Sequence, residues 1–306
     1  MAYVVVAGGT NVDIGGRSYA PLVAGDSNPG RVTVSLGGVG RNIAHDLALL
    51  GVETVLLTAL GGDARAEDVA RSCAALGIDL SHALRVPEGR TSTYLYLSGP
   101  GGEMALAVSD MDLCERLTPA YFAAQQTVLD GAALVVLDAN LPQASLCWLA
   151  EHCRAPLFAD PVSTVKGEKL RPILDRLHTL KPNRLEAERL TGVPIRDEAG
   201  LAAAARALLA LGPRRVAITL GADGVLCADE RGLVHVPAVP AAPRDVTGAG
   251  DAFTAALAWA YLEGEDLAES ARLAAAAAAL TVEHEETNDP DLSAAAVRDR
   301  RERNEA

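Results

Sequence analysis

Apolar runs of strand length alternate along most of the chain with segments whose apolar residues recur every three or four positions. Residues 3–7 (YVVVA) form an unbroken apolar run closed by two glycines, which is typical of a strand buried on both faces of a parallel sheet. A helical pattern follows over residues 40–50, with Gly51 placed to end the helix. This alternation predicts a doubly wound α/β fold with a mostly parallel central sheet flanked by helices. Further predicted strands are 54–58, 134–137, 157–159, 216–220 and 225–228, and further predicted helices are 65–76, 118–130, 143–152, 184–191 and 198–211.

Two segments break this rhythm because their apolar residues alternate singly with other residues, the pattern of a strand with one wet face. They lie in residues 31–36 and 91–97. We expect residues 14–36 and 89–110 to form a small β-sheet lid over a cleft, and residues 1–13, 37–88 and 111–306 to form the core. An equally weighted alternative makes both segments edge extensions of the main sheet.

Charge and cysteine content narrow the class of partner. Lys and Arg number 27 against 40 Asp and Glu, a formal charge of −13, whereas a nucleic-acid surface needs clustered cations. The five cysteines include no C-x-x-C pair, which predicts reduced thiols in a cytoplasmic protein. No apolar stretch is long enough to span a bilayer. We therefore expect small-molecule ligands, with neither nucleic acid nor membrane as a partner.

The sharpest local feature is the polar, glycine-rich segment DVTGAGD at residues 245–251, which leads directly into a helical pattern. Gly248, Ala249 and Gly250 stand where the first N–H groups of a helix lack partners, and such groups bind anions. Asp251 would add a carboxylate beside that anion, as a general base opposite a phosphoryl group does. The alternative is a first-turn acid favoured by the helix dipole alone.

The segment KPNRLEAE at residues 181–188 spaces Asn183 and Glu186 as in a capping box, which needs no further function. A functional interpretation places Glu186 near the metal of a nucleotide, holding Mg²⁺ through water. Both interpretations can hold together. The segment TLGADG at residues 219–224 predicts a hairpin whose glycines allow a nucleotide to approach the backbone.

Asn11 and Asp13 directly follow the first strand, where ligands of open α/β sheets bind, and they are placed to hold vicinal hydroxyls of a sugar. The alternative is that they are ordinary loop residues in an Asx turn. Glycines at residues 37–42 (GGVGRN) suggest a dinucleotide fingerprint, but Ile43 stands where the third small residue belongs. No P-loop sequence appears in the chain.

Taken in order, these motifs resemble the ribokinase-like carbohydrate kinase family over nearly the whole chain. The family's signature D-x-T-G-A-G-D matches residues 245–251, its G-G-x-x-x-N stretch matches 37–42, and its N-x-x-E motif matches 183–186. Within the family, the similarity is greatest to the branch that acts on pseudouridine. The strings that carry it are residues 26–30 (DSNPG), 37–44 (GGVGRNIA), 160–166 (DPVSTVK), 181–188 (KPNRLEAE) and 288–293 (NDPDLS). Residues 109–111 (SDM) depart from the Asn-Asp-Met expected there, which bears on base recognition.

The resemblance implies an ATP-dependent kinase that phosphorylates the 5′-hydroxyl of pseudouridine. It implies Asp251 as the base, with the amides of Gly248, Ala249 and Gly250 stabilising the transferring phosphoryl group. Substrate contacts are implied for Asn11, Asp13, Gly38 and Asn42, and more weakly for Ser27, Asn28, Ser92 and Thr93. Nucleotide contacts are implied for Asn183, Thr219, Gly221, Gly224 and Asn288, and an Mg²⁺ contact through water for Glu186. Asp245 and Thr247 match positions that form a monovalent-cation site in part of the family, which makes K⁺ a candidate ion.

Other functions remain open at this point. A kinase for ribose or for another nucleoside fits the same motifs, and a catalytically silent nucleoside-binding regulator is an alternative of a different class. The presence of both Asp251 and Glu186 favours an enzyme. By analogy with the family, we also expect a homodimer that forms through the lids.

Overall fold

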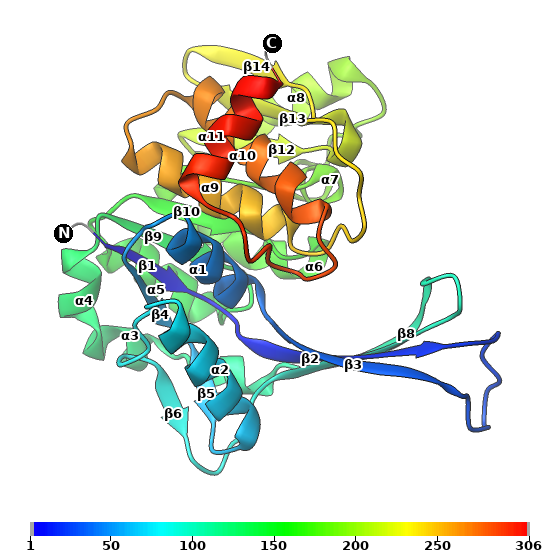
Figure 1. Ribbon diagram of the computed structural model, residues 1–306. Coiled ribbons are helices and arrows are strands. Elements are labelled where there is room, and N and C mark those ends of the chain that lie inside the picture. Colours follow the sequence, from blue (N-terminus) through cyan, green and yellow to red (C-terminus); the bar gives the residue numbers. More distant parts are fainter. Residues whose placement is uncertain (1–2, 305–306) are drawn as a thin grey trace.

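The computed structural model describes residues 3–304, and a large central sheet runs through it (Figure 1). Its eight strands lie in the order β14-β13-β12-β11-β10-β9-β1-β4, parallel from β12 to β4, with β13 and β14 antiparallel. Their bounds are β1 Val4–Ala7, β4 Thr54–Leu57, β9 Leu134–Asp138, β10 Leu157–Asp160, β11 Thr179–Leu180, β12 Arg215–Thr219, β13 Val225–Asp229 and β14 Gly232–Val236. The fold is therefore the predicted doubly wound, mostly parallel α/β architecture.

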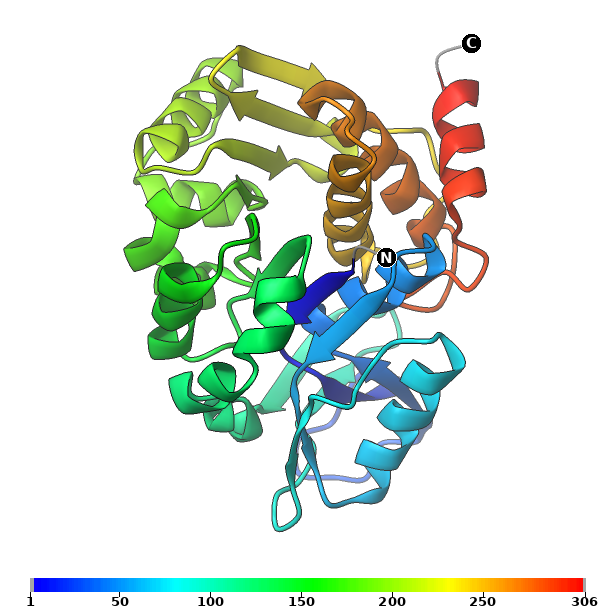
Figure 2. The same cartoon turned by 90° about the vertical axis from the view of Figure 1, so that its left-hand side faces the viewer.

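Helices cover both faces of this sheet (Figure 2). The first face carries α3 (Pro119–Ala124), α4 (Gln126–Gly131), α5 (Gln143–His152), α7 (Arg184–Thr191) and α8 (Glu198–Ala210). The second carries α1 (Val39–Leu49), α2 (Ala64–Ala75), α9 (Ala249–Leu262), α10 (Leu267–Val282) and α11 (Ala294–Arg303). Shorter helical segments are α6 (Thr164–Gly167) and the 3₁₀ helices Asp112–Arg116, Glu168–Arg176 and Gly221–Asp223.

The unbroken apolar runs follow from this two-sided burial. In β1, Val5 and Ala7 belong to the core on the first face, whereas Val4 and Val6 belong to the core on the second. Successive side chains of a strand point to opposite faces, so a strand covered on both sides needs apolar residues at every position.

The structure refines several predicted elements. The single helix predicted over residues 118–130 is two helices, because the chain bends at Gln125 between α3 and α4. Strand β14 was not predicted, nor was the two-stranded sheet of β5 (Ala59–Gly61) and β6 (Leu84–Val86). Three-residue strands are too short for any periodicity to be visible.

The two segments with single alternation form a separate four-stranded sheet, so the alternative of edge extensions to the main sheet is wrong. This accessory sheet has the order β3-β2-β7-β8 and extends away from the body (Figure 1). Its strands are β2 (Asn11–Ser18), β3 (Gly30–Gly37), β7 (Thr93–Ser98) and β8 (Met104–Asp110).

The register of the accessory sheet gives it two unlike faces. One row across the four strands is Val34, Ile14, Leu95 and Val108, whereas the neighbouring row on the opposite face is Ser35, Asp13, Tyr94 and Ser109. One face is thus apolar, and the polar face carries Asp13. Among the described residues, no helix is long and apolar enough to cross a membrane.

Candidate active site

The N-terminus of α9 is built by the predicted glycine-rich turn. Gly248 has a φ of 83°, and a Cβ there would overlap the carbonyl oxygen of Thr287, so only glycine fits. Within the described chain, the N–H groups of Gly248 and Gly250 have no hydrogen-bond partner, while Ala249 N–H approaches Val246 O at 3.4 Å. These N–H groups and the helix dipole can stabilise an anion at this point.

Asp251 lies in the first turn of α9 and is half-buried. Its Oδ2 accepts a hydrogen bond from Asn42 Nδ2 at 2.7 Å, and no described group binds its Oδ1. Burial, reinforced by the charge of Asp160, raises the pKa of Asp251 from 3.8 to about 7, although Asn42 and Lys181 act in the opposite direction. A carboxylate with such a pKa and one free oxygen can accept a proton near neutral pH.

A buried ion pair contacts the backbone of this turn. Lys181 Nζ lies 2.7 Å from Asp160 Oδ2 and 3.4 Å from the carbonyl oxygen of Gly250. Thr254 of α9 also donates to Asp160 Oδ2, at 3.1 Å. Burial lowers the pKa of Lys181, but Asp160 outweighs it, so the pKa stays above its usual range and the lysine is charged. The positive charge stands directly beside the proposed anion site, and sequence reasoning gave Lys181 no role of its own.

The residues predicted to hold a sugar lie together around the start of α1, where Asn42 also lies. Asn11 Nδ2 donates to Asp13 Oδ1 at 2.6 Å, and a Cβ on Gly37 would collide with the Asp13 carboxylate. Gly38 has a φ of 97° and packs against the backbone of Gly9 and Thr10. Burial raises the pKa of Asp13, which Asn11 and Arg41 partly counteract.

Asp138 at the end of β9 holds this region in place. Its Oδ2 accepts hydrogen bonds at 2.8 Å from the N–H groups of both Gly9 and Gly40, which joins the loop after β1 to the first turn of α1. Asn140, which also binds Asp138, accepts a hydrogen bond from Lys166 Nζ at 2.6 Å. None of these three side chains was predicted, because Asp138 has its backbone partners 98 and 129 residues away and the other two act around it.

A cavity of about 630 Å³ lies next to the start of α9. Thr219, Gly221 and Gly224, the predicted nucleotide residues of the β12–β13 hairpin, line it together with Ala249 and Gly250. The rest of its wall is apolar and includes Ala238, Val239, Pro240, Ala241, Pro243, Val246, Phe253, Ala275, Ala278, Ala279 and Val282. An apolar cavity of this size, beside an anion site, can hold a nucleotide base.

A run of six alanines such as that at residues 274–279 is, from sequence alone, typical of a small-residue surface for close helix packing. In the structure it serves two purposes, because Ala274 and Ala277 pack in the core without lining the cavity, whereas Ala275, Ala278 and Ala279 line it. Small side chains on α10 leave the space that the cavity occupies. An alanine pattern alone does not separate a cavity wall from a packing face.

Two predicted residues lie away from both groups, and a third, Asn288, contacts Asn42 but not the nucleotide cavity. Ser27 and Asn28 are in the loop between β2 and β3, at the distal end of the accessory sheet, where the Asn28 side chain binds the backbone of Val23 (Figure 1). Asn288, predicted to contact the nucleotide, is buried beside α1 and donates to Asp46 Oδ1 at 2.8 Å. It does not line the cavity.

Ser92 and Thr93 stand at the base of the accessory sheet. Ser92 Oγ is buried, with the Cys114 thiol as its side-chain partner, whereas Thr93 Oγ1 accepts from Arg65 at 2.6 Å.

The residues predicted to bind metal are Glu186, Asp245 and Thr247, and Asn183, predicted to contact the nucleotide, is paired with Glu186. Asn183 and Glu186 form a reciprocal capping box, with Glu186 Oε2 accepting from Asn183 N–H at 2.8 Å and Asn183 Oδ1 from Glu186 N–H at 2.9 Å. The structural interpretation is therefore confirmed, and the capping leaves Glu186 Oε1 available. Burial, more than any other cause, raises the pKa of Glu186. Asp245 Oδ1 accepts from Thr247 N–H at 2.8 Å, closing a tight turn.

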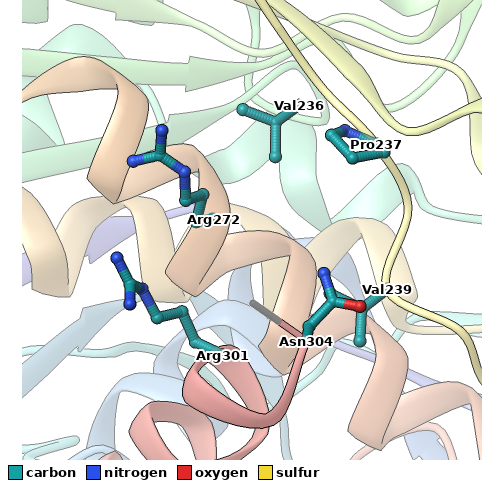
Figure 3. A pocket seen from close by; sticks show the side chains of 6 residues that line it. All are labelled: Val236, Pro237, Val239, Arg272, Arg301 and Asn304. Atoms are coloured by element: carbon teal, nitrogen blue, oxygen red, sulfur yellow. The ribbon is translucent and has the colours of Figure 1, made fainter. Parts of the chain in front are cut away.

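A smaller cavity of about 210 Å³ lies between the end of β14, α10 and α11, and none of the predicted site residues lines it. Figure 3 shows that Arg272 and Arg301 reach it from two neighbouring helices. Both guanidinium groups bind Glu269, at 3.0 and 2.8 Å, which ties α11 to α10. We assign this cavity no part in the site.

Several known proteins are similar to this chain in sequence and in fold. The sequence matches the pfkB family of carbohydrate kinases over residues 1–294. It is 39% identical to the pseudouridine kinase of Escherichia coli K12, over 96% of this chain and 95% of that protein. It is 36% identical to an uncharacterised sugar kinase, YeiI, of the same organism, over 95% of this chain and 81% of that protein.

Among solved structures, Arabidopsis thaliana ribokinase complexed with ribose and ATP superimposes with a TM-score of 0.88. That pair is 26% identical and covers 98% of this chain and 99% of the other. The family match and these relatives identify a kinase of the class that acts on sugars and nucleosides. The chain belongs to the pfkB family of carbohydrate kinases.

Proposed function

We propose that this protein transfers the γ-phosphoryl group of ATP to the 5′-hydroxyl of pseudouridine, giving pseudouridine 5′-phosphate and ADP. The observation that carries the proposal is the position of Asp251. Its carboxylate is bound by Asn42 on the sugar side, while Ala249 and Gly250 in the same turn line the apolar cavity. A hydroxyl placed at Oδ1 would thus meet a phosphoryl group delivered from the cavity.

In the proposed reaction, Asp251 takes the proton of the attacking hydroxyl as the new O–P bond forms and the bond to ADP breaks. The free N–H groups at the start of α9 stabilise the negative charge on the transferring group. Lys181 adds a fixed positive charge behind Gly250 without a direct place in the cavity lining.

Magnesium accompanies ATP in this proposal, and the residues present suit a contact through water. Glu186 keeps one carboxylate oxygen that the capping box does not use, and a single carboxylate suffices for a metal that retains most of its water. When bound, Mg²⁺ would neutralise charge on the phosphates. A K⁺ site at Asp245 and Thr247 stays a prediction from resemblance.

Pseudouridine as the acceptor is supported by the 39% identity to a pseudouridine kinase. The nearly equal identity to a sugar kinase without an assigned substrate keeps ribose or another nucleoside as an alternative acceptor. The test is ADP release from Mg·ATP with pseudouridine, uridine, cytidine or ribose supplied separately. Preference for uridine or ribose would refute the acceptor, and no turnover with any of them would favour a nucleoside-binding regulator.

We also propose that residues 14–36 and 89–110 act as a lid, with the polar face that carries Asp13 turned to the substrate. The opposite, apolar face is exposed, with Val34 67% and Leu106 63% accessible. A continuous apolar face on a projecting sheet is expected to be covered by another surface. A second copy of this lid is the proposed partner, which would make the protein a homodimer.

A further inference from the structure

Arg41 is a buried cation without a carboxylate partner. Only 3% of it is exposed, and no described acidic side chain pairs with it within salt-bridge distance. Arginine is almost never so buried unless its charge is compensated. The GGVGRN motif contributes Gly38 and Asn42 to the proposed site but gives Arg41 no role.

The compensation comes from hydrogen-bond acceptors in three different parts of the chain, together with the charges of the nearby carboxyls of Asp46, Asp251 and Asp13. Arg41 Nη2 donates to Leu36 O at the end of β3 at 2.7 Å, to Asn288 Oδ1 at 2.8 Å, and to Asn42 Oδ1. Its Nη1 lies 3.0 Å from His45 Nδ1, which must be the acceptor because a guanidinium only donates. Arg41 therefore joins the accessory sheet, α1 and the segment before α11.

A donor-only group determines which way a neighbouring amide faces. Because Asn42 turns its oxygen to Arg41, its NH₂ group points to Asp251, where it donates to Oδ2 at 2.7 Å. Asn288 is oriented in the same way, and its NH₂ group donates to Asp46 Oδ1 at 2.8 Å and to Asn42 O at 3.3 Å. One guanidinium thus orients two amides and leaves Asp251 Oδ1 free.

We propose that Arg41 is a positioning residue that holds the Asn42 amide in the orientation that fixes Asp251, and that it ties this orientation to strand β3 of the lid through Leu36. The inference rests on the proposed role of Asp251. Without Arg41, the Asn42 amide loses its anchor and the Asp251 carboxylate can rotate away from the acceptor hydroxyl. Misplacement by about 1 Å can cost on the order of 100-fold in rate.

The test compares two variants with the wild-type protein. Arg41→Met fills the same space without donors, and Arg41→Ala leaves room for added guanidinium ion. We expect kcat to fall about 10- to 100-fold in both, with an unchanged KM for ATP because Arg41 does not line the cavity. Guanidinium ion at a non-denaturing concentration should restore part of the kcat of Arg41→Ala, but none of the activity lost in Asp251→Asn. Wild-type kcat in Arg41→Met, or no rescue of a folded Arg41→Ala, would overturn the inference.

A second measurement does not depend on turnover. Carbon-13 NMR titration of the Asp251 carboxyl should give a higher pKa in Arg41→Met than in wild type, because a positive charge and a fixed hydrogen bond are lost together. The other charged groups that act on Asp251 are Asp138, Asp160 and Lys181, which are the same in both proteins, and Asp46, whose own carboxyl also feels Arg41 and is therefore titrated alongside Asp251. An identical pKa in the two proteins would contradict positioning by Arg41. If wild type phosphorylates no acceptor while this shift is present, the proposed function fails and the positioning stands.

Discussion

Asn42 Nδ2 and Asp251 Oδ2 lie 2.7 Å apart although 209 residues separate them in the chain. This contact joins the first turn of α1 to the first turn of α9, and so brings the sugar-side residues to the anion site. It also leaves the carboxylate with one oxygen for chemistry. The predictions below depend on this arrangement.

The rate should depend on pH through Asp251. Its pKa of about 7 means that the base is largely protonated below neutrality. We expect kcat/KM to fall tenfold per pH unit below about pH 7 and to level off above it. The measurement is kcat/KM for the acceptor between pH 5.5 and 9 at saturating Mg·ATP, and a flat profile across that range would remove Asp251 as the base.

Asp251 should also reduce the stability of the fold. A carboxyl whose pKa is higher in the folded protein than the 3.8 of the unfolded chain binds its proton more tightly when folded. Stability is therefore lost as pH rises from about 4 to about 7. Asp251→Asn carries no charge, so it should be more stable than wild type at pH 8, by on the order of a few kcal/mol, with a smaller difference at pH 5. Urea unfolding at both pH values measures this, and equal stabilities at pH 8 would contradict it.

Two substitutions at Glu186 separate its structural role from its proposed metal role. Gln preserves a capping box, whereas Ala removes it. We expect Glu186→Gln to keep the melting temperature but to require a higher Mg²⁺ concentration for half-maximal rate. Glu186→Ala should lower the melting temperature, at a cost of about 1 kcal/mol in stability, and should also raise the Mg²⁺ concentration needed for half-maximal rate. If Glu186→Gln matches wild type in Mg²⁺ dependence, the residue is a cap and nothing more.

Gly248 is predicted to be irreplaceable for activity. In Gly248→Ala the new Cβ would overlap Thr287 O and distort the N–H groups at the start of α9. Gly264→Ala is a matched control, because Gly264 has nearly the same φ, 84° against 83°, with open space around its Cβ position. Gly264→Ala should lose only about 1 kcal/mol from backbone strain and keep its activity, whereas Gly248→Ala should lose more stability because of the overlap and should also lose activity. Equal kcat values for the two variants would contradict an anion site at this turn.

The lid interface is tested by charge on its apolar face. The double variant Val34→Lys, Leu106→Lys should be monomeric by light scattering, whereas wild type should be dimeric. Val165→Lys changes an apolar residue of α6 that is still more exposed, at 78%, and serves as the control, which should remain dimeric. A monomeric wild type, or a double variant that still dimerises, would exclude this surface as the interface.

Much of the fold followed from local patterns. The continuous apolar run at residues 3–7 and the alternation at 31–36 predicted a buried strand and an accessory sheet because burial on two faces or one leaves different periodicities. In the same way, the first turn of α9 and the capping box of α7 are encoded within a few residues each.

What could not be predicted depends on contacts between distant residues. Lys181 pairs with Asp160, Asp138 holds Gly9 and Gly40, and Arg41 meets Asn288, 247 positions away. No local pattern specifies such pairs. The alanines of α10 were misleading for another reason, since one composition serves both helix packing and a cavity wall.

The central claim is phosphorylation of pseudouridine with Asp251 as the base. It is tested most directly by offering equal concentrations of pseudouridine and uridine with Mg·ATP in one reaction. The two nucleoside monophosphates are isomers of equal mass, so they are separated by chromatography and quantified against authentic standards of each. We predict pseudouridine 5′-phosphate as the main product, and a rate lower by about 10²- to 10⁴-fold with Asp251→Asn. Uridine monophosphate as the main product, or full activity of Asp251→Asn, would contradict the account.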